Sequence, residues 1–108
     1  MGIVRKEADV TLVMDPAGDE IRALRKVLHW RGKSVLEVGC GDGRLTLRLA
    51  GLGAEHITAF DPDPKSIRTA RKNLPNQYKE RIRYLVGNAE HVRQRAGLFD
   101  VVVFSWVL

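Results

Sequence analysis

The sequence predicts an α/β protein built on a doubly wound parallel sheet. Short apolar segments rich in branched residues alternate with amphipathic segments that are long enough to connect parallel strands. The run VVVF at 101–104 is apolar at every position, which is typical of a strand covered on both faces. Because 108 residues leave room for one core, we assign 1–15 to a lead segment and 16–108 to a single domain.

The N-terminal part of the chain contains one predicted helix. Residues 10–14 (VTLVM) are apolar without a clear period, and we expect either a short strand or a cover over the core. A helix is expected over 16–30, because Pro16 stands at its start, acids follow, and apolar residues then recur at helical spacing. Gly32 is expected to end it.

In the rest of the chain, strands and helices alternate. Branched and aromatic residues mark the strands, whereas apolar residues on one face and a following glycine or proline mark the helices. The expected elements are strands at 33–39, 56–61, 81–88 and 98–107, a helix at 44–53 closed by Gly51 or Gly53, a helix at 64–75 closed by Pro75, and a short helix or turn at 89–96.

A glycine-rich turn follows the first of these strands. Gly39, Gly41 and Gly43 allow the backbone to adopt positive φ and a ligand to approach it closely. The N–H groups at the start of the next helix are expected to be free to donate. Ligands of open parallel sheets bind outside the carboxyl ends of the strands, so we expect the ligand at this turn.

Two acids make the expected ligand more specific. Glu37 is expected to direct a negative charge at the same pocket, unless it is a solvated acid at the strand end; a charge about 4 Å away disfavours phosphate by several kcal/mol and favours a cation. Asp61 ends the second strand, where its oxygens could accept from both ribose hydroxyls. Its alternative role is a helix N-cap, which Asp63 could fill instead. S-adenosylmethionine suits such a site, because it carries a sulfonium, an ammonium and a nucleoside but no phosphate.

Four segments resemble, in order and spacing, the successive motifs of the class I S-adenosylmethionine-dependent methyltransferases. They are VLEVGCGDGRLTLRLA at 35–50, ITAFDPDPKSIRTARKNL at 57–74, RIRYLVGNAEHV at 81–92 and FDVVVFSWVL at 99–108. The resemblance implies a Rossmann-like sheet in the strand order 3-2-1-4, truncated after the fourth strand, where family members continue with three more strands. It also implies methyl transfer from S-adenosylmethionine by in-line displacement to an unknown acceptor.

The resemblance also implies roles for individual residues. The acid and glycines of the first motif would surround the methionine part of the cofactor, Asp61 would hold the ribose, and Pro62 and the loop after the third strand would contact the adenine. Glu90 is a further candidate in that loop, where the family more often has Asp than Asn88. The cofactor-binding candidates are Glu37, Gly39, Cys40, Gly41, Gly43, Asp61, Pro62, Asn88, Ala89 and Ser105.

The C-terminal residues bear on the acceptor. The segment 105–108 (SWVL) lacks the N/D-P-P-Y motif of enzymes that methylate amino groups of bases or glutamine, and it resembles the small-molecule and general branch. Ser105 and Trp106 would line the methyl-transfer end of the pocket, or else be a strand end and a core aromatic. None of the three histidines, His29, His56 and His91, is an evident general base, so the catalytic residues are unknown.

Composition argues against several other classes. The net charge of +5 would suit nucleic acid, but the basic residues recur at helical spacing without interleaved aromatics, as on solvated helix faces. A single cysteine and scattered histidines argue against a metal site. No segment is apolar enough for a membrane span or a signal core, so we expect a cytoplasmic protein without membrane or nucleic-acid partners.

Two other functions stay open at this point. One is a non-catalytic module that binds S-adenosylmethionine and needs a partner or second copy to complete its sheet. The other is a nicotinamide-dependent oxidoreductase, against which Glu37 and the G-x-G-x-G spacing argue. In the order 3-2-1-4 the fourth strand is an uncovered apolar edge, so we expect it to recruit a second copy or another chain.

Overall fold

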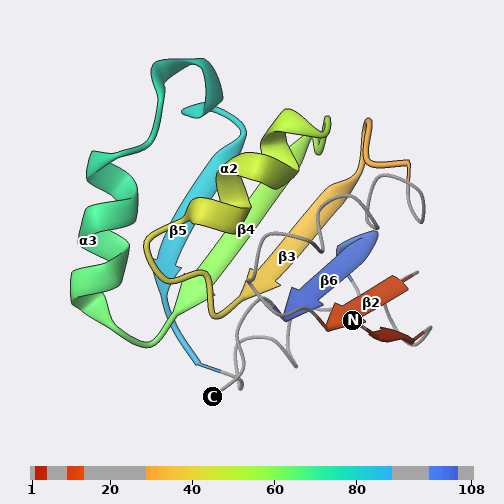
Figure 1. Ribbon diagram of the computed structural model, residues 1–108, viewed down its shortest axis with the longest axis horizontal. Helices are drawn as coiled ribbons and strands as arrows, with labels where there is room; N and C mark the ends of the chain where they lie inside the picture. The colour runs from red at the N-terminus through yellow and green to blue at the C-terminus, as the bar shows by residue number, and fades with distance from the viewer. Residues whose placement is uncertain (1, 5–9, 14–28, 89–97, 105–108) are drawn as a thin grey trace.

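The computed structural model describes residues 2–4, 10–13, 29–88 and 98–104. They form one six-stranded sheet with two α-helices (Figure 1). The elements are β1 (Gly2–Val4), β2 (Val10–Val13), β3 (Ser34–Val38), α2 (Arg44–Gly51), β4 (His56–Asp61), α3 (Pro64–Lys72), the 3-10 turn η1 (Asn76–Tyr78), β5 (Ile82–Val86) and β6 (Val101–Phe104).

The four predicted strands are parallel and lie in the predicted order. β5, β4, β3 and β6 are neighbours in that sequence, which is the order 3-2-1-4 when the predicted strands are counted along the chain. In Figure 1 their arrowheads point in the same direction, so the carboxyl ends of the four strands lie along one side of the sheet. This side therefore gathers the residues that follow each strand, including both acids and the glycines of the predicted site.

The fourth predicted strand, β6, is not an edge. β2 pairs with β6 in parallel, Val10 opposite Val101, and β1 pairs with β2 in antiparallel. The prediction that this strand is an uncovered edge is therefore wrong. An apolar strand without a neighbour leaves backbone groups unpaired, and the segment 10–13 of the same chain supplies the missing neighbour. The strand alternative for this segment is thereby confirmed.

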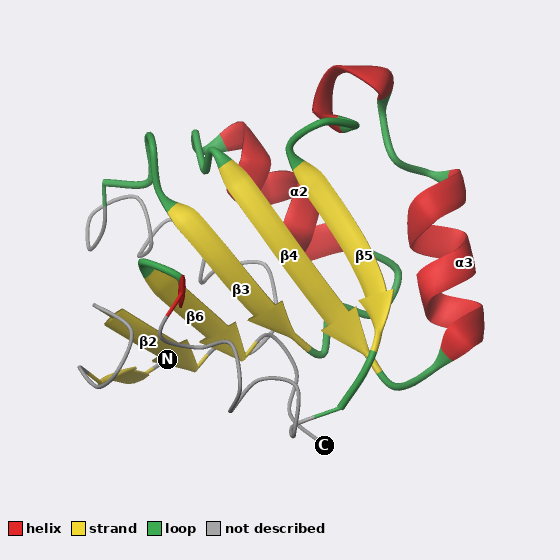
Figure 2. Ribbon diagram, turned by 180° about the vertical axis from the view of Figure 1, so that it is seen from behind, coloured by secondary structure: helices red, strands yellow, loops and turns green. Residues whose placement is uncertain are grey.

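Both faces of the central strands are covered. α2 and α3 lie on one face (Figure 2), where Leu49 and Ile67 join the larger apolar cluster. Leu36, Phe60 and Val102 form a second buried cluster on the opposite face. The apolar run in β6 contributes to both clusters, as expected for a doubly wound sheet.

The helix ends differ from the predicted ones. α2 ends at Gly51 and is followed by Gly53 with a φ of 108°, so Gly53 rather than Gly51 has the left-handed conformation that follows a helix. α3 ends at Lys72, three residues before Pro75, and the chain then enters η1, which was not predicted. Residues 29 and 30 are not helical; the rest of the predicted helix at 16–30 and the segment at 89–96 lie outside the described residues.

Candidate functional site

The turn between β3 and α2 contains three glycines with left-handed backbone. Gly39, Gly41 and Gly43 have φ values of 81°, 54° and 91°. Residues with a Cβ rarely adopt this region, so the sequence G-x-G-x-G is what permits the turn. The prediction of positive φ at these positions is confirmed.

Gly41 and Gly43 have different surroundings. A Cβ built on Gly41 would meet no heavy atom within 4 Å in the part of the chain that the structure describes. A Cβ on Gly43 would collide with Tyr84 Oη and lie 3.0 Å from Tyr84 Cζ. Gly41 therefore leaves backbone open to a ligand, whereas Gly43 allows the start of α2 to lie close to the Tyr84 side chain of β5.

Asp61 joins the glycine turn to the end of β4. The Gly41 N–H donates to Asp61 Oδ2 at 2.9 Å, and the Asp63 N–H donates to Oδ1 at 2.9 Å. On the other side, the Gly87 N–H donates to the Asp61 carbonyl oxygen at 3.1 Å. The side chain is half-buried, and each carboxylate oxygen has a further lone pair with which to accept. The segments after β3, β4 and β5 thus meet at one acid.

Asp63, and not Asp61, is the N-cap of α3. Its Oδ1 accepts from the Lys65 N–H at 3.0 Å and its Oδ2 from the Ser66 hydroxyl at 2.9 Å, with Pro64 in the first helical position. The hydrogen bond from Ser66, followed by the one from Lys65, lowers the pKa of Asp63. The alternative role considered for Asp61 is therefore filled by its neighbour.

Glu37 is enclosed beneath α2. Its side chain is 0% exposed, and the Thr46 hydroxyl donates to Oε1 at 2.5 Å. The prediction that this carboxylate faces the ligand directly does not match its burial, because alternation along β3 turns it to the face that α2 covers. Its charge acts on the site across a low-dielectric interior, near the positive end of the helix.

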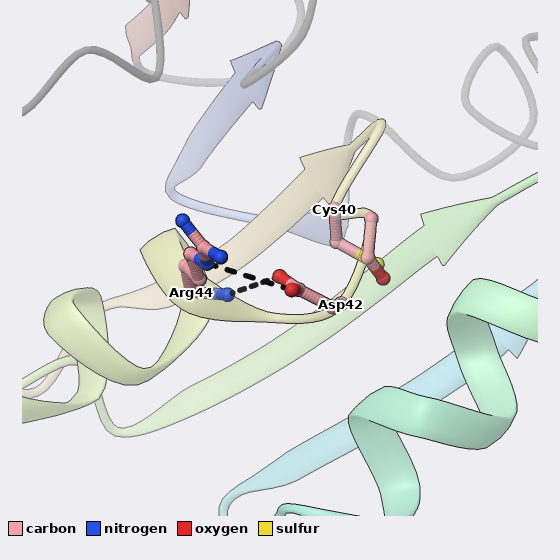
Figure 3. A network of polar contacts seen from close by, with 4 residues as sticks. Cys40, Asp42 and Arg44 are labelled. Atoms are coloured by element: carbon pink, nitrogen blue, oxygen red, sulfur yellow. Dashed lines mark hydrogen bonds and ion pairs between the residues drawn. The ribbon is translucent and has the colours of Figure 1, made fainter.

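Within the turn Cys40 is buried, whereas Asp42 and Arg44 are exposed; Figure 3 shows these three side chains. Cys40 is 7% exposed, and its Sγ contacts the Gly41 carbonyl oxygen at 3.7 Å. Burial, followed by the charges of Glu37 and Asp61, raises the pKa of the Cys40 thiol, so it stays protonated at neutral pH. Cys40 therefore contributes packing and not a nucleophile.

Asp42 and Arg44 form the exposed rim of the turn. Arg44 Nε lies 3.5 Å from Asp42 Oδ2, and the Arg44 N–H donates to Oδ1 at 3.4 Å (Figure 3). The Arg44 side chain is 88% exposed, so solvent screens this ion pair. The pair nevertheless places a third carboxylate close to the turn, beside Glu37 and Asp61.

Many backbone N–H groups of the turn donate within the protein. Donors used in this way are not available to a phosphate, which needs several of them. The donor and acceptor pairs are Gly39 and Cys40 to Phe60, Gly41 to Asp61, Gly43 to Cys40, and Arg44 to Asp42. The predicted free donors belong to the first turn of α2, from which only Arg44 is among these pairs.

The remaining predicted residues are only partly described. Pro62 is exposed between the two acids, and Asn88 is exposed just after β5. His56 opens β4 at the edge opposite the glycine turn, as predicted. The candidates Ala89 and Ser105 lie outside the described residues, together with Glu90, His91 and Trp106.

Two buried polar residues at the site were not predicted. Thr46 is 0% exposed and bonds Glu37, and Tyr84 is 4% exposed with its hydroxyl under Gly43. Burial raises the pKa of Tyr84 to about 12; the Thr46 hydroxyl offsets part of this rise and the charge of Glu37 adds to it. One signal was present in the sequence, because Thr46 is a polar residue between the leucines that define the buried face of α2.

The described residues show neither a metal site nor a membrane segment. In residues 29–88 and the described strands, no three His, Cys, Asp or Glu side chains are grouped to hold a metal ion. None of the described helices is both long enough and apolar enough to cross a membrane.

Comparison with known proteins decides the family. Residues 35–108 match the family described as methyltransferase domain. The chain belongs to this methyltransferase-domain family. A ribosomal protein L11 methyltransferase from Thermotoga petrophila is 35% identical to the domain over 80 residues, covering 74% of this chain and 29% of that protein. The mitochondrial ubiquinone biosynthesis O-methyltransferase of Schizosaccharomyces pombe is 39% identical over 79 residues, covering 71% and 28%.

Solved structures share the fold of this methyltransferase domain. An S-adenosylmethionine-dependent methyltransferase from Mesorhizobium loti aligns with a TM-score of 0.56 at 22% identity, over 68% of this chain and 31% of that one. An arsenic(III) S-adenosylmethionine methyltransferase from Chlamydomonas reinhardtii aligns with a TM-score of 0.60 at 22% identity, over 79% and 38%. The predicted Rossmann-like fold and the resemblance to methyltransferases are thus confirmed. The chain spans less than half the length of the curated relatives it matches.

Proposed function

We propose that this methyltransferase domain binds S-adenosyl-L-methionine where β3 and β4 end, and that it is the cofactor-binding part of an enzyme that methylates a small molecule. One observation carries the proposal: Asp61 bridges the open backbone at Gly41 to the end of β4, while Asp63 caps the helix. Because Asp63 is the N-cap of α3, the carboxylate of Asp61 can accept hydrogen bonds from vicinal ribose hydroxyls while the helix keeps its cap.

The charges around the turn favour a cationic adenosyl ligand. Glu37, Asp42 and Asp61 all act electrostatically on Cys40, in the middle of the turn. Their combined field attracts a sulfonium and repels phosphate. The internal hydrogen bonds of the turn act in the same direction, because they remove N–H donors that a pyrophosphate requires. A dinucleotide such as NAD is therefore the weaker candidate.

In this proposal the chain orients the cofactor. When bound, the cofactor supplies an activated methyl group for in-line displacement by an acceptor. Asp61 holds the ribose, the open face of Gly41 lets the backbone approach the methionine part, and buried Glu37 contributes its charge. Asn88, which is exposed after β5, is proposed to contact the adenine edge. Holding the cofactor in one geometry is what the described residues contribute to the rate.

The acceptor is proposed to be a small molecule, in a cytoplasmic setting. The two curated relatives are named for ribosomal protein L11 and for ubiquinone biosynthesis, so similarity in the cofactor-binding part does not select an acceptor. A non-catalytic cofactor-binding module is the second candidate, because the observations that carry the proposal concern cofactor binding. A partner strand on β6 is not part of the proposal, because β2 occupies that edge.

Calorimetric titration of the purified chain tests the cofactor. We expect S-adenosylmethionine to bind and NAD not to bind; the reverse result would overturn the proposal. Asp61→Ala should weaken binding by roughly 1.5–3 kcal/mol, the value of hydrogen bonds to a charged group. The matched control is Asp63→Ala, which removes the same charge two residues away and should leave affinity unchanged. Turnover of a panel of small-molecule acceptors then separates an enzyme from a non-catalytic module.

A further inference from the structure

Tyr84 lies in a row of side chains beneath α2. It pairs with Ala59 across β4 and β5, and Ala59 pairs with Glu37 across β3 and β4, so all three side chains share one face of the sheet. The small side chain of Ala59 leaves space in the middle of the row, between Glu37 and Tyr84. Thr46 of α2 lies above this row, where its hydroxyl bonds Glu37 and influences the ionisation of Tyr84.

The hydroxyl of Tyr84 is buried and has no hydrogen-bond partner in the part of the chain that the structure describes. A phenylalanine would fill the same space and avoid the free-energy cost of burying an unpaired hydroxyl. The hydroxyl lies under the left-handed Gly43, whose missing Cβ leaves room for Oη, Cζ and Cε1 of the ring. The hydroxyl therefore occupies the space that a side chain at Gly43 would need, whereas the corresponding space at Gly41 is open.

We propose that Tyr84 is a positioning residue of the cofactor site. Its hydroxyl determines how far the glycine turn lies from the sheet and how the side chain of Thr46 is oriented. Through Gly43 it fixes the backbone that continues to Gly41, whose N–H bonds Asp61. Thr46 bonds the carboxylate of Glu37, so a hydrogen bond from Tyr84 to Thr46 would also hold that carboxylate in place. When the cofactor docks on the turn, a small shift of α2 closes the hydrogen bond from Tyr84 to Thr46. This inference rests on the proposed function, since it names a determinant of the same site.

The experiment compares two tyrosines that contact opposite ends of α2. Tyr84→Phe removes the hydroxyl under the N-terminal end. The matched control Tyr78→Phe removes a hydroxyl at the other end, where Tyr78 Oη lies 3.8 Å from the Cβ position of Gly51. Each full-length variant is titrated with S-adenosylmethionine, its thermal unfolding is followed, and the amide signal of Gly41 is recorded by ¹⁵N NMR.

We expect Tyr84→Phe to weaken S-adenosylmethionine binding roughly five- to thirty-fold, as for the loss of one positioning hydrogen bond. Its Tm should be unchanged or higher, because an unpaired buried hydroxyl has been removed. The Gly41 amide signal should shift in Tyr84→Phe and stay in place in Tyr78→Phe. Wild-type affinity in Tyr84→Phe would overturn the proposal, and so would an equal loss of affinity in the two variants.

Thr46 variants keep the proposal testable if Tyr84→Phe fails to fold. Thr46→Val should weaken binding about as much as Tyr84→Phe, Thr46→Ser should restore it, and the double variant should be no weaker than either single one. Additive losses, or Thr46→Val with wild-type affinity, would overturn the proposal. If the wild-type chain itself does not bind S-adenosylmethionine, the proposed function fails. The Gly41 amide signal, recorded without a ligand, then shows whether the Tyr84 hydroxyl affects the glycine turn.

Discussion

At the scale of single residues, the same substitution should have different effects at two glycines of one turn. Alanine at Gly41 or Gly43 must adopt a φ of 54° or 91°, which is strained. Only at Gly43 does the new methyl group also collide with Tyr84. We expect Gly43→Ala to lower the free energy of unfolding by about 2–4 kcal/mol and Gly41→Ala by about 1–2 kcal/mol, as measured by urea denaturation.

A shorter side chain at position 84 tests whether collision with Tyr84 causes the greater destabilisation by Gly43→Ala. Tyr84→Leu should reduce the additional loss caused by Gly43→Ala and leave the effect of Gly41→Ala unchanged. Equal losses in the two glycine variants would contradict the contact with Tyr84. Gly41→Ala should instead weaken S-adenosylmethionine binding, because its methyl group enters the open space beside the turn.

The buried thiol of Cys40 predicts a dependence on alkaline pH. Its pKa is raised in the folded chain, so the unfolded chain loses its proton first. Stability that is complete at neutral pH should be lost above about pH 8.5, by up to about 1.4 kcal/mol per pH unit. Urea unfolding at about pH 7 and pH 10 measures this loss. Cys40→Ala should show a smaller one, and parallel losses in both proteins would exclude Cys40 as the cause.

The N-cap role that the sequence offered for Asp63 is confirmed, whereas the burial of Glu37 beneath α2 was not predicted. Asp63 precedes Pro64 and has Ser66 three residues later, so the N-cap is a local pattern. The sequence shows which residues of β3 share a face with Glu37, because side chains alternate along a strand. Which of the two faces α2 covers depends on the path of the chain. The contact between Tyr84 and Gly43 is still harder to predict from the sequence, because only packing brings these two residues together.

At the scale of the elements, the C-terminal end of α2 depends on an arginine that immediately precedes β5. Arg81 Nη2 donates to the Ala50 carbonyl oxygen at 2.8 Å and to that of Ala54. These carbonyls belong to the end of the helix and the turn after it, where intrahelical donors are missing. We expect Arg81→Met to lower the free energy of unfolding by about 1.5–3 kcal/mol.

Arg83 provides the control for this prediction. It lies two residues further along the chain, within β5, and its side chain is exposed. Arg83→Met should change the free energy of unfolding by less than about 0.5 kcal/mol. If the two variants were equally destabilised in urea denaturation, loss of charge and not loss of the helix contact would be responsible.

The N-cap of α3 predicts a dependence on acidic pH. The pKa of Asp63 is lowered by its bonds from Ser66 and Lys65, so its stabilisation is present above the ordinary carboxyl pKa and is lost as pH falls below it. Asp63→Ala should lower the Tm at about pH 6, and the difference from wild type should shrink toward about pH 3. Asp63→Asn keeps an N-cap acceptor and should stay closer to wild type at pH 6.

The types of the described elements were more predictable than their ends. Periodicity identified α2, α3 and the four parallel strands, because amphipathic spacing reflects which face is buried. The end of α3 at Lys72 was missed, since the chain leaves the helix at Asn73 before the proline that could have ended it. The turn η1 has no apolar period that would mark it.

At the scale of the whole molecule, β2 closes the sheet where another strand could otherwise add. Removing residues 1–13 should expose the edge of β6 and produce self-association that rises with protein concentration. Light scattering of the full and shortened chains measures the difference. The same association state for both chains at every concentration would show that β2 does not protect this edge.

The sheet was predictable except for its two N-terminal strands. Parallel pairing of β5, β4, β3 and β6 follows from short crossovers and from the family resemblance. The pairing of β2 with β6 joins segments that share no connection and no local signal, so only the demand of an apolar strand for a second neighbour could have suggested it.

That same pairing sets the order in which the chain can fold during synthesis. Val10 and Val101 are partners, so β2 leaves the ribosome long before the strand on which it will lie exists. At about 5–20 residues per second, the delay is roughly 5–20 s. The strands β3, β4 and β5, whose partners are close in sequence, can pair during that time. Of the described strands, β1 and β2 are therefore made early but dock late, and the glycine turn with its acids can form before this sheet is complete.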